Sequence, residues 1–189
     1  MSEDRSVAEL ASQVRLRPMR IADLDVLMRY EQQMFGPEAW SRQGYLDELA
    51  DTELRHYIVA EGIVAERTVA EGIGVEEPVA EEGVPDHRLL GTGGLLTIGD
   101  TAQILTVGVL PSARRRGVGR LLVRALVAEA RRRRAGEVLL EVREDNEAAR
   151  RLYAGEGFAV LGRRRGYYEQ GRVDAVTMRY PLQPEGNRS

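Results

Sequence analysis

The 189-residue chain contains no cysteine and no lysine. Without cysteine it can form no disulfide, no thiolate metal site and no cysteine nucleophile. Without lysine it can form no Schiff base with a carbonyl substrate. Only two histidines are present, His56 and His87, so a histidine-rich metal site is not expected either. Chemistry in this protein must come from carboxylates, hydroxyls, arginines and the backbone, and we expect no metal.

Long apolar runs and a strong net charge are also missing. No stretch approaches the roughly 18 apolar residues that a membrane-spanning helix needs. The acidic, polar start MSEDRSVAELASQ does not resemble a signal peptide. The net charge is −3, whereas nucleic-acid-binding domains usually have a basic face. We therefore expect a cytoplasmic protein that binds neither membranes nor nucleic acid. The sequence leaves the oligomeric state open, with a monomer favoured.

Hydrophobic patterning predicts one domain over residues 14–182, with flexible tails at 1–13 and 183–189. Helices are predicted over Ile21–Phe35, after Trp40 with Ser41 as the N-cap, after Gly117, and over Asn146–Ala154. Strands are predicted between them, at residues 14–17, 56–60, 89–98, 104–110, 137–142, 158–161 and 173–180. Roughly seven strands and about four helices indicate a mixed α/β (α+β) sheet.

Residues 61–88 form an acidic, repeat-like insertion. The segments Val59–Gly62, Val69–Gly72 and Val79–Glu82 recur every ten residues, and eight acidic residues stand against the single Arg67 between Glu61 and Asp86. We interpret the insertion as an expanded, partly disordered loop. A longer β-hairpin, or an acidic lip that attracts a basic substrate, are the alternatives.

The stretch Ile104–Leu126 combines a strand, a tight loop and a helix. The first four N–H groups of a helix have no partner within it, and the helix dipole favours negative charge there. Glycines such as Gly117 and Gly119 would let phosphates approach that backbone closely. The stretch therefore predicts a phosphate-binding loop, with an ordinary glycine loop before a packed helix as the alternative. Its spacing matches neither a P-loop nor a dinucleotide fingerprint.

Three further features surround this loop. Gly108 within a strand predicts a bulge or the close approach of another backbone or ligand, and Pro111 would part that strand from its neighbour. Glu141 interrupts an apolar strand beside the resulting cleft, where it could be a general base, a solvated strand end or the partner of an arginine. Tyr153, on the next helix, could donate a proton into the cleft or belong to the core.

Together these motifs make the chain resemble the GNAT superfamily of N-acetyltransferases. The shared pattern includes [Q/R]-x-x-G-x-[G/A] around Gly117, and within the superfamily the chain is most similar to the ribosomal-protein-alanine N-acetyltransferases. That likeness rests on Trp40-Ser41, LEVREDN at 140–146, RLYAGEGF at 151–158, RGYY at 165–168 and VDAVTM at 173–178. It implies a GNAT fold with a splayed sheet and acetyl-CoA as co-substrate.

The resemblance also implies roles for individual residues. Glu141 takes the place of the general base and Tyr153 that of the general acid. The acetyl-CoA-binding positions are Val107, Gly108, Val109, Arg114, Arg115, Arg116, Gly117, Val118, Gly119, Arg120 and Asn146. For the acceptor side of the cleft we expect Trp40, Tyr167 and Tyr168, with core packing as the alternative. Where family members often have N-I-A-V-D, this chain has Thr106 to Leu110.

The implied reaction is transfer of an acetyl group to a protein N-terminus, first of all the N-terminal alanine of a small-subunit ribosomal protein. A broader range of N-terminal peptides, a small-molecule amine, and a non-catalytic acetyl-CoA-binding module are the alternatives. Nucleic-acid binding through the arginine runs at 114–116, 131–134 and 163–165 is less favoured. The first run is better explained by a pyrophosphate, the second by a solvated helix end and the third by an exposed strand end.

Overall fold

The computed structural model describes residues 13–62 and 88–182. The segments 1–12, 63–87 and 183–189 lie outside the described residues, and so do the predicted tails and nearly all of the insertion. The described elements are β1 Val14–Pro18, α2 Asp23–Phe35, η1 Gly36–Glu38, α3 Arg42–Ala50, β2 Arg55–Gly62, β3 Arg88–Ile98, β4 Thr101–Val109, η2 Pro111–Ala113, α4 Val118–Arg132, β5 Glu137–Arg143, α5 Glu147–Gly155, β6 Ala159–Tyr168, η3 Glu169–Gly171 and β7 Val173–Pro181.

Seven strands of the described chain form one mixed sheet in the order β1-β2-β3-β4-β5-β7-β6. Only the central pair β4–β5 is parallel, and every other neighbouring pair is antiparallel. The parallel pair requires a crossover, which α4 supplies. The predicted mixed α/β fold, with seven strands and four α-helices in the described ranges, is confirmed.

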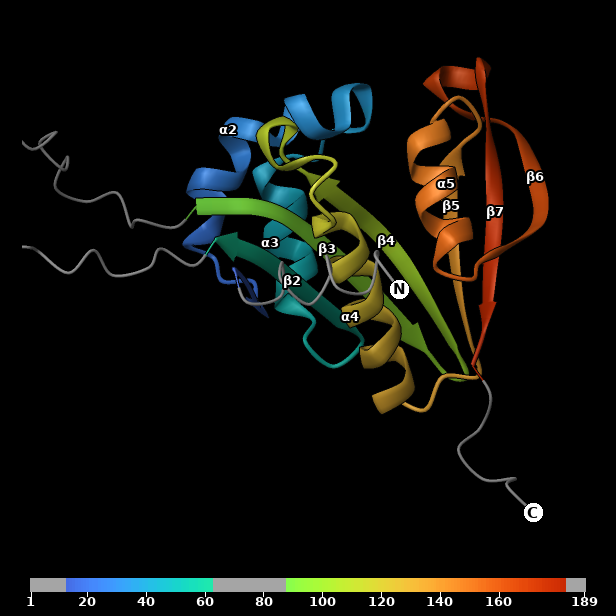
Figure 1. The fold of residues 1–189 in the computed structure, drawn as a ribbon, viewed down its shortest axis with the longest axis horizontal. Helices are drawn as coiled ribbons and strands as arrows, with labels where there is room; N and C mark the ends of the chain where they lie inside the picture. Colours follow the sequence, from blue (N-terminus) through green and yellow to red (C-terminus); the bar gives the residue numbers. More distant parts are fainter. Residues whose placement is uncertain (1–12, 63–87, 183–189) are drawn as a thin grey trace, which may run out of the picture.

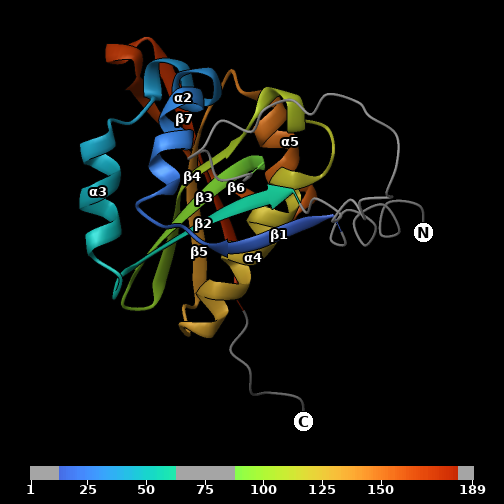
Figure 2. The same cartoon turned by 90° about the vertical axis from the view of Figure 1, so that its left-hand side faces the viewer.

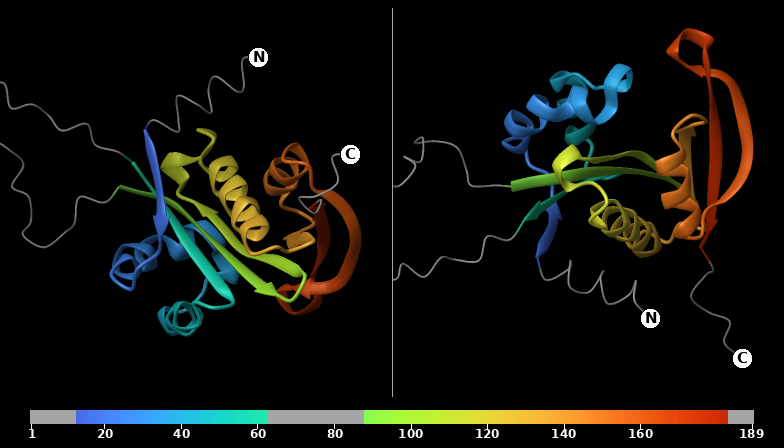
Figure 3. Two further views of the ribbon diagram at one scale, coloured as in Figure 1. Left: turned by 90° about the horizontal axis from the view of Figure 1, so that it is seen from below. Right: turned by 45° about the horizontal axis from the view of Figure 1, so that its top comes forward.

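The α-helices cover both faces of the sheet. Figure 2 shows α2 and α3 on one side and α4 and α5 on the other, and the two views of Figure 3 agree. Within the described ranges, no helix is long and apolar enough to cross a bilayer. The sheet is thus the middle layer of three, and a cleft within it can be approached from either face.

Helix α4 packs closely on β3 because two glycines of that strand leave room for leucines. A Cβ at Gly91 would lie 3.2 Å from Leu122 Cδ1, and one at Gly93 would lie 3.0 Å from Leu126 Cδ1. Both leucines are fully buried, as the helical spacing of the apolar residues requires. Truncating either to alanine would cost roughly 2–5 kcal/mol of stability. This packing fixes the start of α4 relative to β4.

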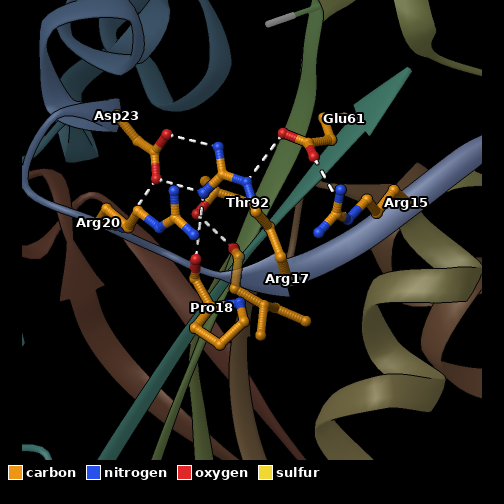
Figure 4. A network of polar contacts seen from close by, with 8 residues as sticks. Arg15, Arg17, Pro18, Arg20, Asp23, Glu61 and Thr92 are labelled. Carbon is orange, nitrogen blue, oxygen red and sulfur yellow. Dashed lines mark hydrogen bonds and ion pairs between the residues drawn. The ribbon is translucent and has the colours of Figure 1, made fainter. Parts of the chain in front are cut away.

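A buried arginine ties β1 to α2 and β2 (Figure 4). The guanidinium of Arg17 makes two 2.7 Å hydrogen bonds to the Asp23 carboxylate, and its Nε donates to Glu61 at 2.9 Å. Asp23 also accepts the backbone N–H of Arg20 at 2.7 Å. The network places the first turn of α2 against the sheet. Removing one partner of such a buried set leaves an uncompensated charge and costs roughly 3–5 kcal/mol.

Several predicted boundaries were wrong, among them the start of β4, which lies at Thr101 rather than Ile104. Helix α2 begins at Asp23 rather than Ile21, whose side chain is 58% exposed. The Asp23 carboxylate binds the Arg17 guanidinium and the Arg20 backbone N–H, and these contacts hold the chain before Asp23 in a turn. Strand β6 continues to Tyr168, well beyond the predicted end at Leu161. As an edge strand it exposes most of its residues, so its sequence has no apolar alternation to mark its length.

Candidate active site

The sheet opens between β4 and β5. The two strands pair only over residues 101–104 and 137–140, and Figure 1 shows them running apart beyond that point. Opposite β3, Leu105 is one extra residue in the ladder, a β-bulge that bends β4 just where the separation begins. The predicted splayed sheet is confirmed, and its opening lies at the carboxyl ends of β4 and β5.

Val107 and Val109 turn backbone groups into this opening. The N–H of Leu110 donates to the carbonyl of Leu90, so the alternation of an antiparallel ladder directs the N–H and carbonyl of Val109 away from β3. Val107, two residues earlier, has the same orientation. The Val109 carbonyl already accepts the Nε of Arg114 at 3.2 Å. Beyond the pairing with β5, the N–H groups of Val107 and Val109 and the carbonyl of Val107 therefore point into the opening, where a ligand could reach them.

Gly108 makes room for a side chain rather than a ligand. A Cβ at this position would lie 2.4 Å from Cζ of Phe35 and 3.1 Å from the sulfur of Met34. The predicted close approach is therefore that of the end of α2, and the bulge occurs at Leu105 instead. Any larger residue at Gly108 would push α2 away from β4.

The loop before α4 has the geometry of an anion-binding site. Gly117, the N-cap of α4, has φ +86°, and Arg115 also lies in the left-handed region with φ +61°. In the described structure no hydrogen-bond acceptor meets the backbone N–H groups of residues 115–120, whereas Leu121 already bonds to Gly117. The side chains of Arg114, Arg115 and Arg116 are exposed around them. Val118 is buried, and a Cβ at Gly119 would lie 3.1 Å from Cδ2 of Leu152 on α5, so both residues lie close against the body of the protein and anchor the loop.

Two residues that were predicted to bind the cofactor, Arg120 and Asn146, make contacts within the protein. The Arg120 guanidinium lies 2.8 Å from Glu156, which it shares with Arg124. The amide oxygen of Asn146 caps α5 by accepting the N–H of Ala149 at 3.1 Å. The backbone N–H of Arg120 and the amide nitrogen of Asn146 are not used in these contacts.

Glu141 lies on β5, just past the last residue that pairs with β4. Its side chain is 14% exposed, and its carboxylate lies 2.5 Å from Nη1 of Arg164 on β6. Arg164 in turn stacks over the ring of Tyr167, with 4.4 Å between guanidinium carbon and ring centroid. Glu141 is thus paired with an arginine, one of the three predicted alternatives, at the position expected for a general base.

The predicted acceptor tyrosines gather around Glu141. Tyr168 donates its hydroxyl to the Glu141 carbonyl at 3.4 Å, and its ring meets that of Tyr167 edge-on at 5.0 Å. Burial, reinforced by the charge of Glu141, raises the pKa of Tyr168 to about 12. The pKa of Tyr167 is raised chiefly by its hydrogen bond to Glu141. Both phenols are therefore neutral donors at physiological pH.

Tyr153 approaches from the other face of the sheet. It lies on α5, is 7% exposed, and packs edge-on against Phe158 at 5.9 Å. Burial raises its pKa, and the nearby Tyr168 raises it further. Glu141 and Tyr153 share no hydrogen bond in the described structure, but Tyr168 interacts with both. The two predicted catalytic residues flank the opening of the sheet from opposite sides.

Trp40 is anchored apart from the tyrosines. Its backbone N–H donates to the buried carboxylate of Glu31 at 3.0 Å, and its ring packs 5.3 Å from that of Tyr45. Within the described ranges it shares no ring contact with Tyr167 or Tyr168. Burial raises the pKa of Glu31, against the hydrogen bonds from Trp40 and Tyr45. Trp40 thus belongs to the segment that joins α2 to α3.

Sequence reasoning assigned no role to Arg143 or Arg164, and it did not identify Arg164 as the partner of Glu141. Arg143 lies two residues after Glu141, a spacing that places both on one face of a strand, so alternation alone could have found it. No sequence pattern links Arg164 to Glu141, which lies 23 residues away. In the arginine run at residues 131–134, at the end of α4, Arg132 and Arg133 pair with Glu129.

A separate hollow of about 380 Å³ lies among the end of β1, α3, the start of β2 and Arg133. Its charged groups already pair with one another: Arg55 contacts Glu48 and Asp51, and Tyr57 donates to Glu48. The opening between β4 and β5 has unpaired backbone donors and is the better site. Among residues 13–62 and 88–182, no three histidine or acidic side chains group in a way that could hold a metal.

Comparisons with known proteins all match this chain to acetyltransferases. A sequence model described as the acetyltransferase (GNAT) family matches residues 26–158. N-alpha-acetyltransferase RimI of Mycobacterium tuberculosis is 44% identical over 95 residues, which cover 48% of this chain and 58% of that protein. A putative ribosomal protein bS18-alanine N-acetyltransferase of Bacillus subtilis is 27% identical over 89% of this chain and 96% of its own length.

The fold has a solved counterpart. The crystal structure of the ribosomal-protein-S18-alanine N-acetyltransferase from Escherichia coli superposes with a TM-score of 0.70 at 24% sequence identity. The superposition covers 93% of this chain and 98% of the other. At this identity the likeness concerns the fold alone.

Proposed function

This chain belongs to the acetyltransferase (GNAT) family of acyltransferase enzymes, and we propose that it acetylates the N-terminal α-amino group of a protein, with acetyl-CoA as donor. The observation that carries the proposal is the position of Glu141. The carboxylate and two tyrosines meet where β4 and β5 part, beside the backbone groups of Val107 and Val109.

Acetyl-CoA would bind along β4 and across the loop before α4. The N–H groups of residues 115–120 and the arginines at 114–116 fit a pyrophosphate, because hydrogen bonds and opposite charge act together there. The pantetheine arm would continue along Val107 and Val109, replacing the missing strand partner with amide hydrogen bonds. That path brings the thioester to the opening beside Glu141.

The acceptor must lose a proton before it can attack. An α-amino group has a pKa of about 8, roughly two units below that of a lysine side chain, which makes its deprotonation about 3 kcal/mol cheaper. Glu141, directly or through water, would accept the ammonium proton once Arg164 has moved aside. The amine nitrogen then forms a bond to the acetyl carbon, and the N–H of Val109 would stabilise the oxyanion.

Collapse of this intermediate breaks the carbon–sulfur bond. Tyr153 would donate its proton to the departing thiolate and regain one from solvent. Its raised pKa keeps the phenol protonated until that step. The reaction needs no covalent enzyme intermediate. The attacking nitrogen is positively charged in the tetrahedral intermediate, so it must lose a second proton as the amide forms, and this proton would leave to solvent water.

For the acceptor we propose the N-terminal alanine of a small-subunit ribosomal protein. The names of the B. subtilis relative and of the E. coli structure support this substrate, and the name of the M. tuberculosis relative supports acetylation of an α-amino group. The test is a panel of peptides that differ only in the first residue, Ala, Ser, Met or Gly, with spermidine as a small-amine competitor. Acetylation of the alanine peptide at the highest kcat/KM is expected.

A mass-spectrometric survey of protein N-termini, with and without this protein, extends the test to whole cells. Loss of acetylation at the N-terminal alanine of one ribosomal protein is expected. Preference for spermidine over every peptide would contradict the proposal. Acetyl-CoA binding without thiol release, with any amine, would favour a non-catalytic module instead.

A further inference from the structure

Arg143 stands at the open end of the cleft. It is the last residue of β5, three positions beyond the last pair with β4, where the two halves of the sheet are already apart. Its side chain is 21% exposed. A cation that is this buried must be held by several partners.

Two of the partners belong to its own half of the sheet. Asp145 accepts hydrogen bonds from Nε at 3.0 Å and Nη2 at 2.8 Å, and Glu169 of η3 lies 2.7 Å from Nη1. The guanidinium also lies 5.7 Å from the ring centroid of Tyr168. These contacts fix Arg143 and connect it to a tyrosine that bonds to the Glu141 backbone.

The third carboxylate comes from across the cleft. Glu38 belongs to η1, which follows α2 on the other half of the molecule, and its carboxylate lies 3.6 Å from Nη1 of Arg143. That nitrogen makes ion pairs but no hydrogen bond of acceptable geometry. The contact to Glu38 is therefore looser than those to Asp145 and Glu169, and it is the one that can open while Arg143 stays in place.

The segment that carries Glu38, Gly36–Ser41, is held at two points. Glu31 fixes the backbone of Trp40 at one end, and Arg143 holds Glu38 near the other. We name this segment the entrance loop. It lies near Tyr168, because the Arg143 guanidinium that contacts Glu38 at 3.6 Å also lies 5.7 Å from the ring centroid of Tyr168.

We propose that Arg143 is a positioning residue that holds the entrance loop across the mouth of the cleft through Glu38, and so sets the width of the acceptor entrance. The inference rests on the proposed function, since it assigns the acceptor to this mouth. Arginine suits the role because its planar fork can meet several carboxylates at once, which a lysine ammonium cannot do with the same geometry.

Kinetics give the first test. In Arg143→Gln the acceptor-peptide KM should rise about fivefold, the order expected for a partly exposed ion pair, while kcat and the KM for acetyl-CoA stay near wild type. The acceptor-peptide KM of Arg143→Lys should lie between those of wild type and Arg143→Gln. The KM of Glu38→Gln should be close to that of Arg143→Gln. The matched control is Arg179→Gln, which breaks an Arg–Glu pair between β7 and β5 at the closed end of the cleft.

The second test needs no activity. Because the chain has no cysteine, Pro37→Cys and Arg172→Cys provide a unique pair of spin-label sites, one on each side of the mouth. A single narrow distance is expected with Arg143 present, and a broader or longer distribution with Arg143→Gln or Glu38→Gln.

The outcomes separate the two ideas. Unchanged distances and unchanged acceptor KM in folded Arg143→Gln and Glu38→Gln proteins would overturn the positioning role. If the protein acetylates no peptide, but the spin-label distance still broadens or lengthens in Arg143→Gln and Glu38→Gln, the proposed function is refuted while the positioning role of Arg143 stands. If Arg179→Gln changed the acceptor KM and the spin-label distance as much as Arg143→Gln does, the loss of any arginine ion pair would explain both changes. That result would also overturn the role of Arg143.

Discussion

The carboxylate of Glu141 lies 2.5 Å from Nη1 of Arg164, and the same guanidinium stacks on Tyr167. The proposed base is therefore already occupied by a cation, at the place where the ammonium of an acceptor must arrive. Arg164 is 56% exposed and sits on an edge strand, so it can leave at little cost.

Removing Arg164 should make the acceptor bind better. In Arg164→Gln the ammonium no longer competes with a resident guanidinium, so we expect the acceptor KM to fall about two- to fivefold, with the KM for acetyl-CoA unchanged. Initial rates over a range of peptide concentrations measure this effect. Arg163→Gln, which breaks the neighbouring pair with Glu144, is the control. A rise in acceptor KM would mean that Arg164 binds the acceptor instead.

Glu141→Gln and Tyr153→Phe should each reduce turnover and leave the affinity for acetyl-CoA nearly intact. General acid–base groups typically contribute about 10²- to 10⁴-fold to rate. Both replacements keep side-chain size, so calorimetric titration with acetyl-CoA should give wild-type dissociation constants. Wild-type rates in both variants would remove these residues from the mechanism.

Gly117→Ala should weaken acetyl-CoA binding. Gly117 has φ +86°, and an alanine there costs roughly 1–2 kcal/mol of backbone strain, so the loop should relax away from the geometry that presents its N–H groups. We expect a rise in the KM for acetyl-CoA without a comparable rise for the peptide. Gly155→Ala serves as the control, because its Cβ would meet nothing within 4 Å and its φ is not positive.

Stability should depend on Glu129 in a defined pH range. Burial alone would raise the pKa of Glu129, but hydrogen bonds from Arg132 and Arg133 outweigh it and lower the pKa to about 2. A depressed carboxyl pKa stabilises the fold above the unfolded value of 4.5, and that contribution disappears as the pH falls toward 2.

Urea unfolding of wild type and Glu129→Gln, from pH 7 to pH 2.5, measures this contribution. The difference in unfolding free energy should be at most about 3 kcal/mol at pH 7, at 1.36 kcal/mol per pKa unit, and should shrink through pH 4. Glu147→Gln, which breaks an exposed pair with Arg151, should cost less than about 0.5 kcal/mol at any pH. A difference that stays constant with pH would contradict the assignment.

The sequence predicted the fold where local patterns and the tertiary structure agree. The apolar face of α4 and the Ser41 cap follow from spacing and capping chemistry. A cleft beside β4 was predicted from Gly108 and Pro111, but the two strands already part after Ile104, at the bulge of Leu105. The family resemblance added the positions of Glu141 and Tyr153, whose roles remain predictions.

The ion pairs at the cleft could not be predicted in the same way. Arg164 and Glu38 reach Glu141 and Arg143 from elements far along the chain, and an exposed arginine has the same appearance in the sequence whether it is paired or free. The length of β6 was missed for a related reason, because an edge strand rich in arginine carries no apolar alternation. Gly108 was predicted to mark a bulge or the approach of a backbone or ligand, whereas the side chain of Phe35, 73 positions earlier in the sequence, lies against it and only packing reveals this contact.

The register between β2 and β3 explains how this fold accommodates a long insertion. Gly62 and Arg88 are direct partners across the two strands, so the chain leaves the sheet and re-enters it at adjacent points. Shortening a connection of this length to a four-residue turn should change the closure entropy by only roughly 1.5 kcal/mol. This junction is therefore a permissive position, where natural variation or engineering can lengthen, shorten or replace the connection without rebuilding the strands on either side.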